Sequence, residues 1–285
     1  MPARNAFCSE ASLEDAEPLA GTAGRVDHWI LVEYRAPLGY DALVGSGLSD
    51  RVKVRLREQA DARPLTKLVF VRRTKRRGSR GLTVLWGSSP ERGGSFSRAE
   101  FEGYDELLEL DLTEPGEPVG HPLILVCTHG KHDRCCARRG RPVYRALADR
   151  AEEGWVWQSS HLGGHRFAGN AVFLPEGLYF GRLRPGEAGP VLDEYLAGRI
   201  EFEHYRGRAC YGLPEQAAER AVREATGLTG VDDLELVRGD GPRVTFRGGG
   251  RTFDVEVTSE PGPLTYLSCD ADAPERRPRH SARLL

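Results

Sequence analysis

The sequence predicts an α/β fold, because short apolar runs with strand character alternate with helical patterns along most of its 285 residues. Hydrophobic residues make up 39% of the chain and charged residues 29%, a balance that excludes collagen-like, disordered and membrane-spanning proteins. At roughly 150 residues per domain, this length predicts about two domains. The formal net charge of −2 reflects no excess of basic groups, so we expect no nucleic-acid partner.

The first predicted unit is an N-terminal α/β domain over residues 1–118. Residues 29–34 form an apolar run that predicts a buried strand, and the prolines and glycine of residues 114–118 indicate the loop that ends the unit. The other predicted elements are a helix start within residues 12–23, a helix at 51–62, and strands at 68–71, 82–86 and about 107–112.

A central domain is predicted over residues 119–207. An apolar strand at 122–127 begins it, and a polar loop at 128–141 follows. Pro142 fits the first turn of a helix that continues to about residue 153, since a first-turn residue needs no N–H donor. The remaining predicted elements are strands at 155–159, 171–174 and 178–181 and a closing helix at 190–198.

The last part of the chain predicts a small α+β appendage over residues 208–272 and a disordered tail over 273–285. Residues 215–226 have a helical pattern. Val244 and Phe246 alternate with polar residues, as do Phe253 and Val255, and glycines at 248–250 separate the two runs, which predicts a hairpin.

One region concentrates the residues that could bind a metal. Cys127, Cys135 and Cys136 lie within ten residues, and His161 and His165 follow just downstream. Metal sites need several soft or borderline ligands brought together. The first cysteine ends a strand and the last precedes a helix, so both thiols are held at fixed points, and a helix N-terminus favours the thiolate.

The two histidines flank adjacent glycines, which disfavour a helix and predict a tight loop after a strand. Glycine there allows the backbone to approach a bulky group such as inorganic sulfide. Two thiolates and two neutral imidazoles suit either zinc or a [2Fe-2S] cluster. Eight residues separate Cys127 from Cys136, whereas the cysteines of structural zinc sites are usually two to four apart, which disfavours zinc.

The segment Cys127-Thr-His-Gly-Lys-His-Asp-Arg-Cys-Cys136, followed by His161-Leu-Gly-Gly-His165, resembles the sucrase/ferredoxin-like family, whose pattern is C-x8-C and then H-x-G-G-H. The match covers about residues 123–181, and residues 17–23 more loosely resemble bacterial members. The resemblance implies a thioredoxin-like ferredoxin domain, with the N-terminal unit as a divergent thioredoxin-like domain. It also implies a [2Fe-2S] cluster with Cys127 and Cys136 on the iron that stays ferric and His161 and His165 on the iron that is reduced. Cys135 is an alternative to Cys136 as the second thiolate.

The function implied by this resemblance is one-electron transfer, in redox homeostasis, between electron donor and acceptor proteins that the sequence does not identify. An electron carrier is therefore favoured over a stand-alone enzyme. Two alternatives stay open: a thiol–disulfide oxidoreductase using Cys127, Cys135 and Cys136, and a non-catalytic scaffold stabilised by zinc. We expect His129 and His132 to be neighbours of the site rather than ligands, and Cys8, Cys210 and Cys269 to be thiols without a role.

The sequence also predicts where the protein resides. Its first residues contain no apolar core of signal-peptide length, and the longest apolar runs are too short to cross a bilayer, so we expect a cytoplasmic protein without a membrane partner. Thiols stay reduced in that compartment. Lysine occurs at only four positions among 40 basic residues, a bias towards arginine that favours a GC-rich bacterial genome.

Overall fold

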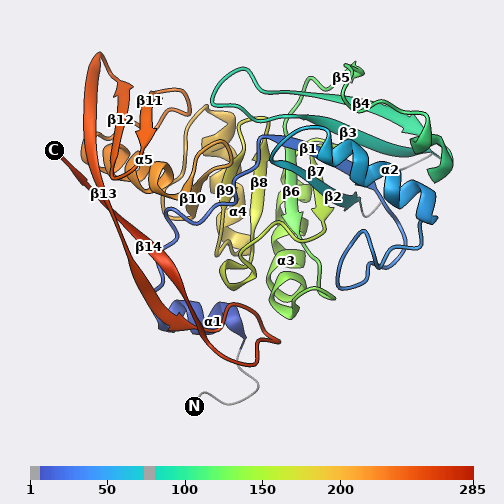
Figure 1. Cartoon of the computed structure of the whole chain (residues 1–285), viewed down its shortest axis with the longest axis horizontal. Helices are drawn as coiled ribbons and strands as arrows, with labels where there is room; N and C mark the ends of the chain where they lie inside the picture. The colour runs from blue at the N-terminus through green and yellow to red at the C-terminus, as the bar shows by residue number, and fades with distance from the viewer. Residues whose placement is uncertain (1–6, 74–80) are drawn as a thin grey trace.

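A computed structural model describes residues 7–73 and 81–285 of the chain, apart from the side chain of residue 240. Its main feature is a ten-stranded mixed sheet (Figure 1). In chain order the strands are β1 (His28–Glu33), β2 (Thr66–Arg72), β3 (Leu82–Ser88), β4 (Ser95–Phe101), β5 (Glu117–Pro118), β6 (Leu123–Cys127), β7 (Val156–Ser159), β8 (Ala171–Leu174), β9 (Leu178–Phe180) and β10 (Tyr205–Arg208). They are ordered β10-β9-β8-β6-β7-β2-β1-β3-β4-β5 across the sheet. The predicted α/β class is confirmed.

The helices accompany this sheet and a smaller one. They are α1 (Cys8–Glu14), α2 (Asp50–Asp61), α3 (Arg134–Arg150), α4 (Pro185–Leu196) and α5 (Leu213–Thr226), with two short 3-10 turns, η1 (Tyr104–Leu108) and η2 (His165–Phe167). The α2 helix begins where the Ser49 side chain accepts a hydrogen bond from the Val52 N–H, as is usual at a helix N-terminus. None of the helices in the described ranges combines the length and the apolar character needed to span a bilayer.

The two halves of the large sheet have the same topology. β1 and β2 are parallel and joined by α2, and β3 and β4 then add antiparallel on the far side of β1. β6 and β7 are likewise parallel and joined by α3, with β8 and β9 added antiparallel on the far side of β6. The halves meet where β2 pairs antiparallel with β7, at Val71 and Ser159. The predicted units 1–118 and 119–207 therefore contribute to one continuous sheet.

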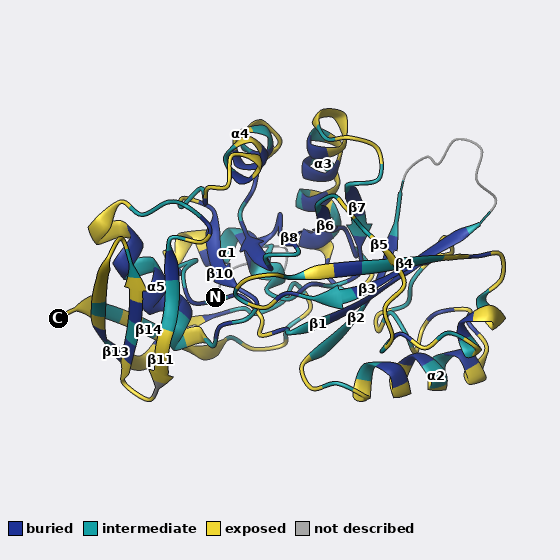
Figure 2. Ribbon diagram, turned by 90° about the horizontal axis from the view of Figure 1, so that it is seen from above, coloured by how far each residue is buried: buried dark blue, intermediate teal, exposed yellow. Residues whose placement is uncertain are grey.

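Each half buries its helices on its own core. Val52 and Leu56 of α2 pack with Ile30 of β1, and residues of α3 and α4 pack with Ile124 of β6. The opposite faces of the two halves share a third core, in which Leu31 and Leu125 both take part. In Figure 2, α3 and α4 lie above the strands and α2 lies below them. The helices of the two halves thus lie on opposite sides of the sheet.

The C-terminal part forms a separate four-stranded antiparallel sheet that packs on α5. Its strands are β11 (Leu234–Asp240), β12 (Arg243–Gly248), β13 (Arg251–Thr265) and β14 (Glu275–Leu284). The predicted hairpin is confirmed, since Val244 pairs with Val255 and Phe246 with Phe253. The prediction of a disordered tail over residues 273–285 is wrong, because Glu275–Leu284 forms β14 and pairs along β13. Backbone hydrogen bonds hold this exposed ribbon, and its polar sequence carries no apolar signal for a strand.

Three local predictions also need correction. The strand predicted at 107–112 does not form, and η1 overlaps the start of that range. The strand that pairs with β3 is instead β4. The helix expected from Pro142 starts eight residues earlier, at Arg134, because the Asp133 side chain accepts a hydrogen bond from the Cys135 N–H and caps it. The α4 helix likewise begins at Pro185, and Pro190 lies inside it. The predictions placed Pro142 and Pro190 in the first turns of these helices, whereas both prolines lie inside helices that start earlier.

Candidate metal centre

The predicted cysteine pair lies at the junction of β6 and α3. Cys127 is the last residue of β6, and Cys136 lies in the first turn of α3. Both thiols are buried. Their sulfur atoms and a ring nitrogen of His161 all lie within 4.8 Å of one another, and the Cys136 Sγ is 3.9 Å from the His161 Nδ1. The strand end and the helix start thus bring together two thiols that are eight residues apart in sequence.

The histidine loop reaches the same place because of how the strands pair. β7 runs parallel to β6, with Ser159 opposite Cys127, so both strands end at one edge of the sheet. His161 and His165 follow β7. A ring nitrogen of His161 lies beside the thiols, whereas His165 lies beside His161, with 5.0 Å between the ring centroids. Loops that follow adjacent parallel strands meet at their carboxyl ends, which is where α/β proteins bind ligands.

A buried arginine holds the loop between the two histidines. Gly163 and Gly164 both have positive φ, at 108° and 70°. The Arg206 guanidinium donates to the Gly163 carbonyl at 3.2 Å and to the Asn170 Oδ1 at 2.9 Å, and the Asn170 amide donates to the Gly164 carbonyl at 2.8 Å. A Cβ at Gly164 would lie 2.4 Å from the Arg206 Nη2, so the close approach requires glycine there.

His132 is a third imidazole at the centre. Its ring stacks on that of His161 with 4.0 Å between centroids, and ligand atoms of His132, His161 and His165 lie within 4.8 Å of one another. The Tyr40 carbonyl is 3.0 Å from the His132 Nδ1, and the two rings stack. We expected His132 to be only a neighbour. The His129-x-x-His132 spacing in the predicted loop is the signal that could have pointed to it.

Hydrogen bonding and burial set the charge of the donor groups. The pKa of Cys127 is held well below its usual range, because Cys136 donates a hydrogen bond to its sulfur and His161 lies beside it. The pKa of Cys136 is correspondingly raised by the hydrogen bond to that thiolate. Burial lowers the pKa of His132 and of His165, which keeps both imidazoles in the neutral form that binds metals.

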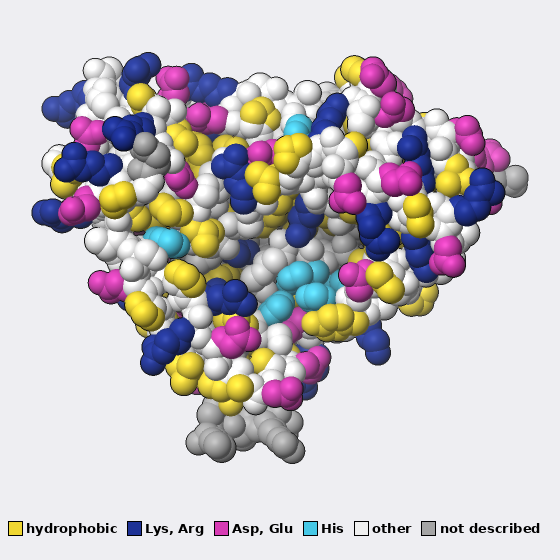
Figure 3. All heavy atoms as spheres, viewed as in Figure 1, with side chains coloured by type: hydrophobic (Ala, Val, Ile, Leu, Met, Phe, Trp, Pro, Cys, Tyr) yellow, Lys and Arg dark blue, Asp and Glu magenta, His cyan; other side chains and the backbone are white. Residues whose placement is uncertain are grey.

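Several buried polar atoms at the centre lack a hydrogen-bond partner. They are the Nδ1 atoms of His129 and His165 and the Oγ of Ser159. Buried polar groups are rarely left unpaired, so such atoms point to a group that the protein binds there. Two thiols next to two imidazoles form a donor set that suits zinc or an iron–sulfur cluster, and the residues present therefore fit a metal group. In Figure 3, histidine side chains gather in a hollow of the molecule.

Cys135 is directed away from this centre. Its sulfur lies 3.2 Å from that of Cys269 and 3.6 Å from that of Cys8, because neighbouring residues on a helix face different directions. Hydrogen bonds from Cys269 and Cys8 lower the pKa of Cys135 to about 3. Cys8 and Cys269, which we expected to be isolated thiols, therefore lie together, whereas Cys210 belongs to neither group.

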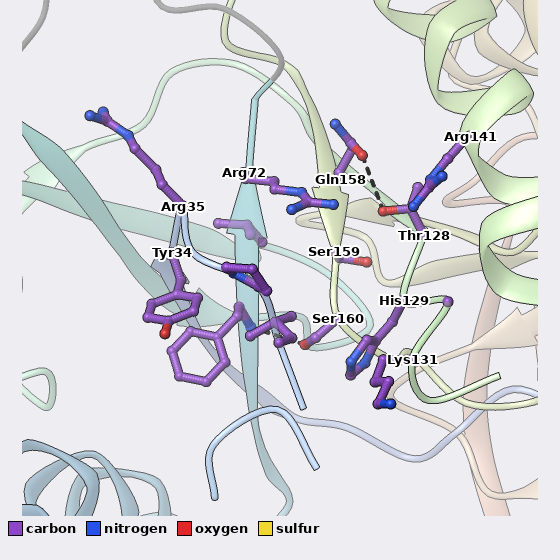
Figure 4. Close-up of a pocket in the computed structure, with 15 residues that line it drawn as sticks. Tyr34, Arg35, Arg72, Thr128, His129, Lys131, Arg141, Gln158, Ser159 and Ser160 are labelled. Atoms are coloured by element: carbon purple, nitrogen blue, oxygen red, sulfur yellow. Dashed lines mark hydrogen bonds between the residues drawn. The ribbon is translucent and has the colours of Figure 1, made fainter. Parts of the chain in front are cut away.

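A basic cavity of about 330 Å³ adjoins the centre. His129, Ser159 and Ser160 line it, together with four cationic side chains and no acidic one, the cations being Arg35, Arg72, Lys131 and Arg141. Figure 4 shows Arg72 and Arg141 on the two sides of the hydrogen bond that joins Thr128 to Gln158. The Ser160 hydroxyl is occupied, since it accepts from the Phe70 N–H at 3.0 Å. The charge of this cavity favours anions next to the metal centre.

Comparisons with known proteins give one family and several relatives. A model described as sucrase/ferredoxin-like matches residues 19–207. Altered inheritance of mitochondria protein 32 of Debaryomyces hansenii is 33% identical over 113 residues, covering 36% of this chain and 40% of that protein. The proteins of the same name from Clavispora lusitaniae and Saccharomyces cerevisiae (strain YJM789) are each 32% identical, covering 32% and 29% of this chain and 36% and 31% of those proteins. The chain thus spans less than half of these relatives' length. No solved structure matches it.

These relatives correct two sequence-based predictions. The expected one-electron carrier has no counterpart among them, since they are named for altered inheritance of mitochondria and not for electron transfer. Neither a thiol–disulfide oxidoreductase nor a zinc-stabilised scaffold is named among them. The expected bacterial character is corrected as well, because the curated relatives come from yeasts.

Proposed function

Since this chain belongs to the sucrase/ferredoxin-like family, we propose that it is a metal-binding protein whose centre is held by Cys127, Cys136, His161 and His165. The observation that carries the proposal is the convergence of both buried thiols and the His161 ring nitrogen within 4.8 Å. The unpaired Nδ1 of His165 supports it, because a buried imidazole nitrogen without a hydrogen-bond partner is free to bind a metal.

The occupant that we propose is the [2Fe-2S] cluster predicted from the sequence, with no role in carrying electrons assigned to it. When bound, such a cluster supplies two iron atoms, one under thiolate and one under imidazole ligation. The proposed ligands of this chain likewise form a thiolate side and an imidazole side. Cys127 and Cys136 are buried and exclude water from the thiolate side, whereas His161 and His165 are half-buried and face the surface.

For the fold around the centre, we propose a thioredoxin-like arrangement. The strand order β9-β8-β6-β7 supports it, with β6 and β7 parallel, α3 between them, and β8 and β9 antiparallel. The same arrangement in β4-β3-β1-β2 supports a divergent thioredoxin-like unit in the N-terminal half. The location that we propose is the cytoplasm, a reducing compartment that would keep the six cysteines as thiols.

Metal analysis of the full chain tests the proposal. The chain is purified without oxygen, and iron, zinc and acid-labile sulfide are measured per chain for the native sequence and for Cys127→Ser, Cys136→Ser, His161→Ala and His165→Ala. We expect about two iron and two sulfide per chain in the native protein and a large loss of both in the two serine variants. Cys210→Ser is the matched control, because Cys210 lies outside every group of the described residues that could hold a metal ion.

The outcomes separate the metal centre from its occupant. If zinc is bound instead and Cys127→Ser removes it, the metal centre stands and the cluster is wrong. If none of the four substitutions changes the content of any metal, the proposed function is overturned.

A further inference from the structure

A second group of metal-binding side chains lies beside the first turn of α3. Cys8, Asp133, Cys135 and Cys269 each place one ligand atom within 4.8 Å of the others. They come from three distant segments, and 261 positions separate the first from the last. Cys8 begins α1, Asp133 and Cys135 lie at the start of α3, and Cys269 lies in the loop between β13 and β14. Figure 1 shows this long hairpin running down one side of the molecule to α1.

The three sulfur atoms are spaced as ligands of a single ion. The distances are 3.6 Å from Cys8 to Cys135, 3.7 Å from Cys8 to Cys269 and 3.2 Å from Cys135 to Cys269. A tetrahedral zinc ion about 2.3 Å from each thiolate sulfur holds the sulfurs about 3.8 Å apart. A disulfide would bring two of them to about 2.05 Å apart and would leave the third thiol unpaired.

The carboxylate of Asp133 completes the set. Its Oδ1 lies 3.2 Å from the Cys269 sulfur, and its Oδ2 lies 3.7 Å from the Cys8 sulfur. The Cys135 N–H donates to Oδ1 and the Cys269 N–H donates to Oδ2, each at 2.8 Å, so the plane of the carboxylate is fixed. Carboxylates that bind metals are commonly oriented by such hydrogen bonds.

The group is also enclosed. Cys8, Asp133 and Cys135 are each 1% exposed or less, and Phe7 and Ala168 pack around the thiols. Burying a charged carboxylate or thiolate is costly unless hydrogen bonds or a bound cation compensate for the lost water, and one cation would compensate all of these groups at once. Arg134 is the cationic side chain nearest in sequence, and its guanidinium donates to the Cys269 carbonyl at 3.2 Å rather than to the ligand atoms.

We propose that Cys8, Cys135, Cys269 and Asp133 bind one zinc ion as a structural site. Thiolate ligands select zinc over calcium or magnesium, which prefer oxygen. Four protein ligands leave no open position for substrate, which is typical of structural rather than catalytic zinc. The site joins the N-terminal helix and the C-terminal hairpin to the start of α3.

This site also bears on the first centre. Cys135 directly precedes Cys136 in α3, whose N-cap is Asp133, and the loop that holds Cys269 places the Leu267 carbonyl in a hydrogen bond with His165. A zinc ion would therefore fix the segments on both sides of the proposed ligands Cys136 and His165.

The test uses the full chain with the first centre removed by Cys127→Ser and Cys136→Ser. After loading with zinc and removal of excess, we expect about one zinc per chain. Adding Cys269→Ser, or Cys8→Ser, is expected to weaken zinc retention against a chromophoric chelator by about 100-fold or more, while adding Cys210→Ser leaves it unchanged. Replacement of zinc by cobalt should give the absorption of a tetrahedral thiolate complex, which the Cys269→Ser variant loses.

A second measurement keeps the proposal testable if these variants fail to fold. In the native chain, alkylation followed by mass mapping should show Cys8, Cys135 and Cys269 protected until a chelator is added, and Cys210 unaffected by the chelator. The proposal is overturned if the doubly substituted chain retains no zinc, if Cys269→Ser retains it fully, or if mapping finds a Cys135–Cys269 disulfide. The zinc assay lacks both thiolates of the first centre, and Cys269→Ser leaves His132, His161 and His165 unchanged. Zinc that Cys269→Ser removes therefore belongs to the second site, independently of the proposed function.

Discussion

Gly140 of α3 lies so close to Cys127 that a Cβ atom at position 140 would stand 1.9 Å from the Cys127 carbonyl oxygen. The absence of a side chain there lets the helix approach the end of β6. The same approach sets Cys136, one turn earlier in α3, beside the Cys127 thiol. A glycine that is not itself a proposed ligand thus determines whether the two cysteines meet.

Gly140→Ala should therefore separate α3 from β6. We expect the free energy of unfolding to fall by about 1–3 kcal/mol, as for other overpacked sites, and the metal content to fall with it. Urea unfolding and metal analysis measure the two effects. Gly186→Ala is the control, because Gly186 is also helical and its Cβ would meet nothing within 4 Å; that variant should be unchanged or slightly more stable. Equal behaviour of the two variants would contradict the prediction.

Arg206 should be essential for the histidine loop. Arg206→Met removes the donors to the half-buried Gly163 carbonyl and to the buried Asn170 side chain, and the unpaired Asn170 oxygen should cost about 1–3 kcal/mol. We expect a lower free energy of unfolding, measured by urea unfolding, and a lower metal content, measured by metal analysis, because the loop that carries His161 and His165 is held less firmly. Arg247→Met, on the exposed surface of β12, should change stability by no more than about 0.5 kcal/mol. Full metal retention in Arg206→Met would show that the loop does not depend on this arginine.

His132→Ala separates a stacking role from ligation. The ring lies 4.0 Å from that of His161, and the Tyr40 carbonyl holds it in place. If His132 orients His161 without binding metal, its removal should weaken metal affinity by about 10–100-fold, which is less than the effect of His161→Ala. Competition with a chromophoric chelator measures both, and His121→Ala is a remote control. A loss as complete as that of His161→Ala would make His132 a ligand.

His204 should make stability depend on pH. Burial opposes its charged form, but Glu201 at 2.9 Å and Glu187 at 3.1 Å outweigh burial and raise the pKa of His204 above its ordinary value of 6.5. A raised pKa in the folded state adds stability that is complete below pH 6.5 and is lost as the pH rises through the folded pKa. A folded pKa that lies one pH unit above the unfolded pKa corresponds to about 1.4 kcal/mol of added stability.

The comparison of His204→Gln with the native chain isolates this contribution. Urea unfolding over about pH 6 to 9 should show a stability gap between the two proteins that is widest at the acid end and closes towards the alkaline end. A gap that widens as the pH rises would reverse the assigned sign.

Much of the fold could be read from local patterns. The apolar runs at β1, β6 and β8 and the amphipathic helices α2 and α5 were predicted because burial imposes a short period on the sequence. Prediction failed where that period is absent. The exposed strand β14 has an arginine- and proline-rich sequence, and its backbone pairing with β13 leaves no trace in side-chain type. The predicted helix start at Pro142 is wrong, because α3 begins eight residues earlier, at Arg134, where the Asp133 side chain caps it.

At the candidate metal centre, too, some features could be predicted from the sequence and others could not. The spacing of Cys127 and Cys136 and the His161-Leu-Gly-Gly-His165 loop lie within 39 residues, and their meeting follows from two adjacent parallel strands. His132 was named as a neighbour of the site, but its stacking on His161 depends on the Tyr40 loop of the other half of the sheet.

By itself, the sequence determined the mixed α/β class and the family, and it predicted the residues of the first centre, because each of these rests on short-range spacing. Only the tertiary structure decided that Cys135 belongs with Cys8 and Cys269, that His132 joins the imidazoles and that the two halves form one sheet. Chain segments from about 30 to more than 100 positions apart meet through packing and strand pairing, and the free energy of those contacts is shared among many residues. No local pattern records such a meeting, so it becomes visible only when the chain is folded.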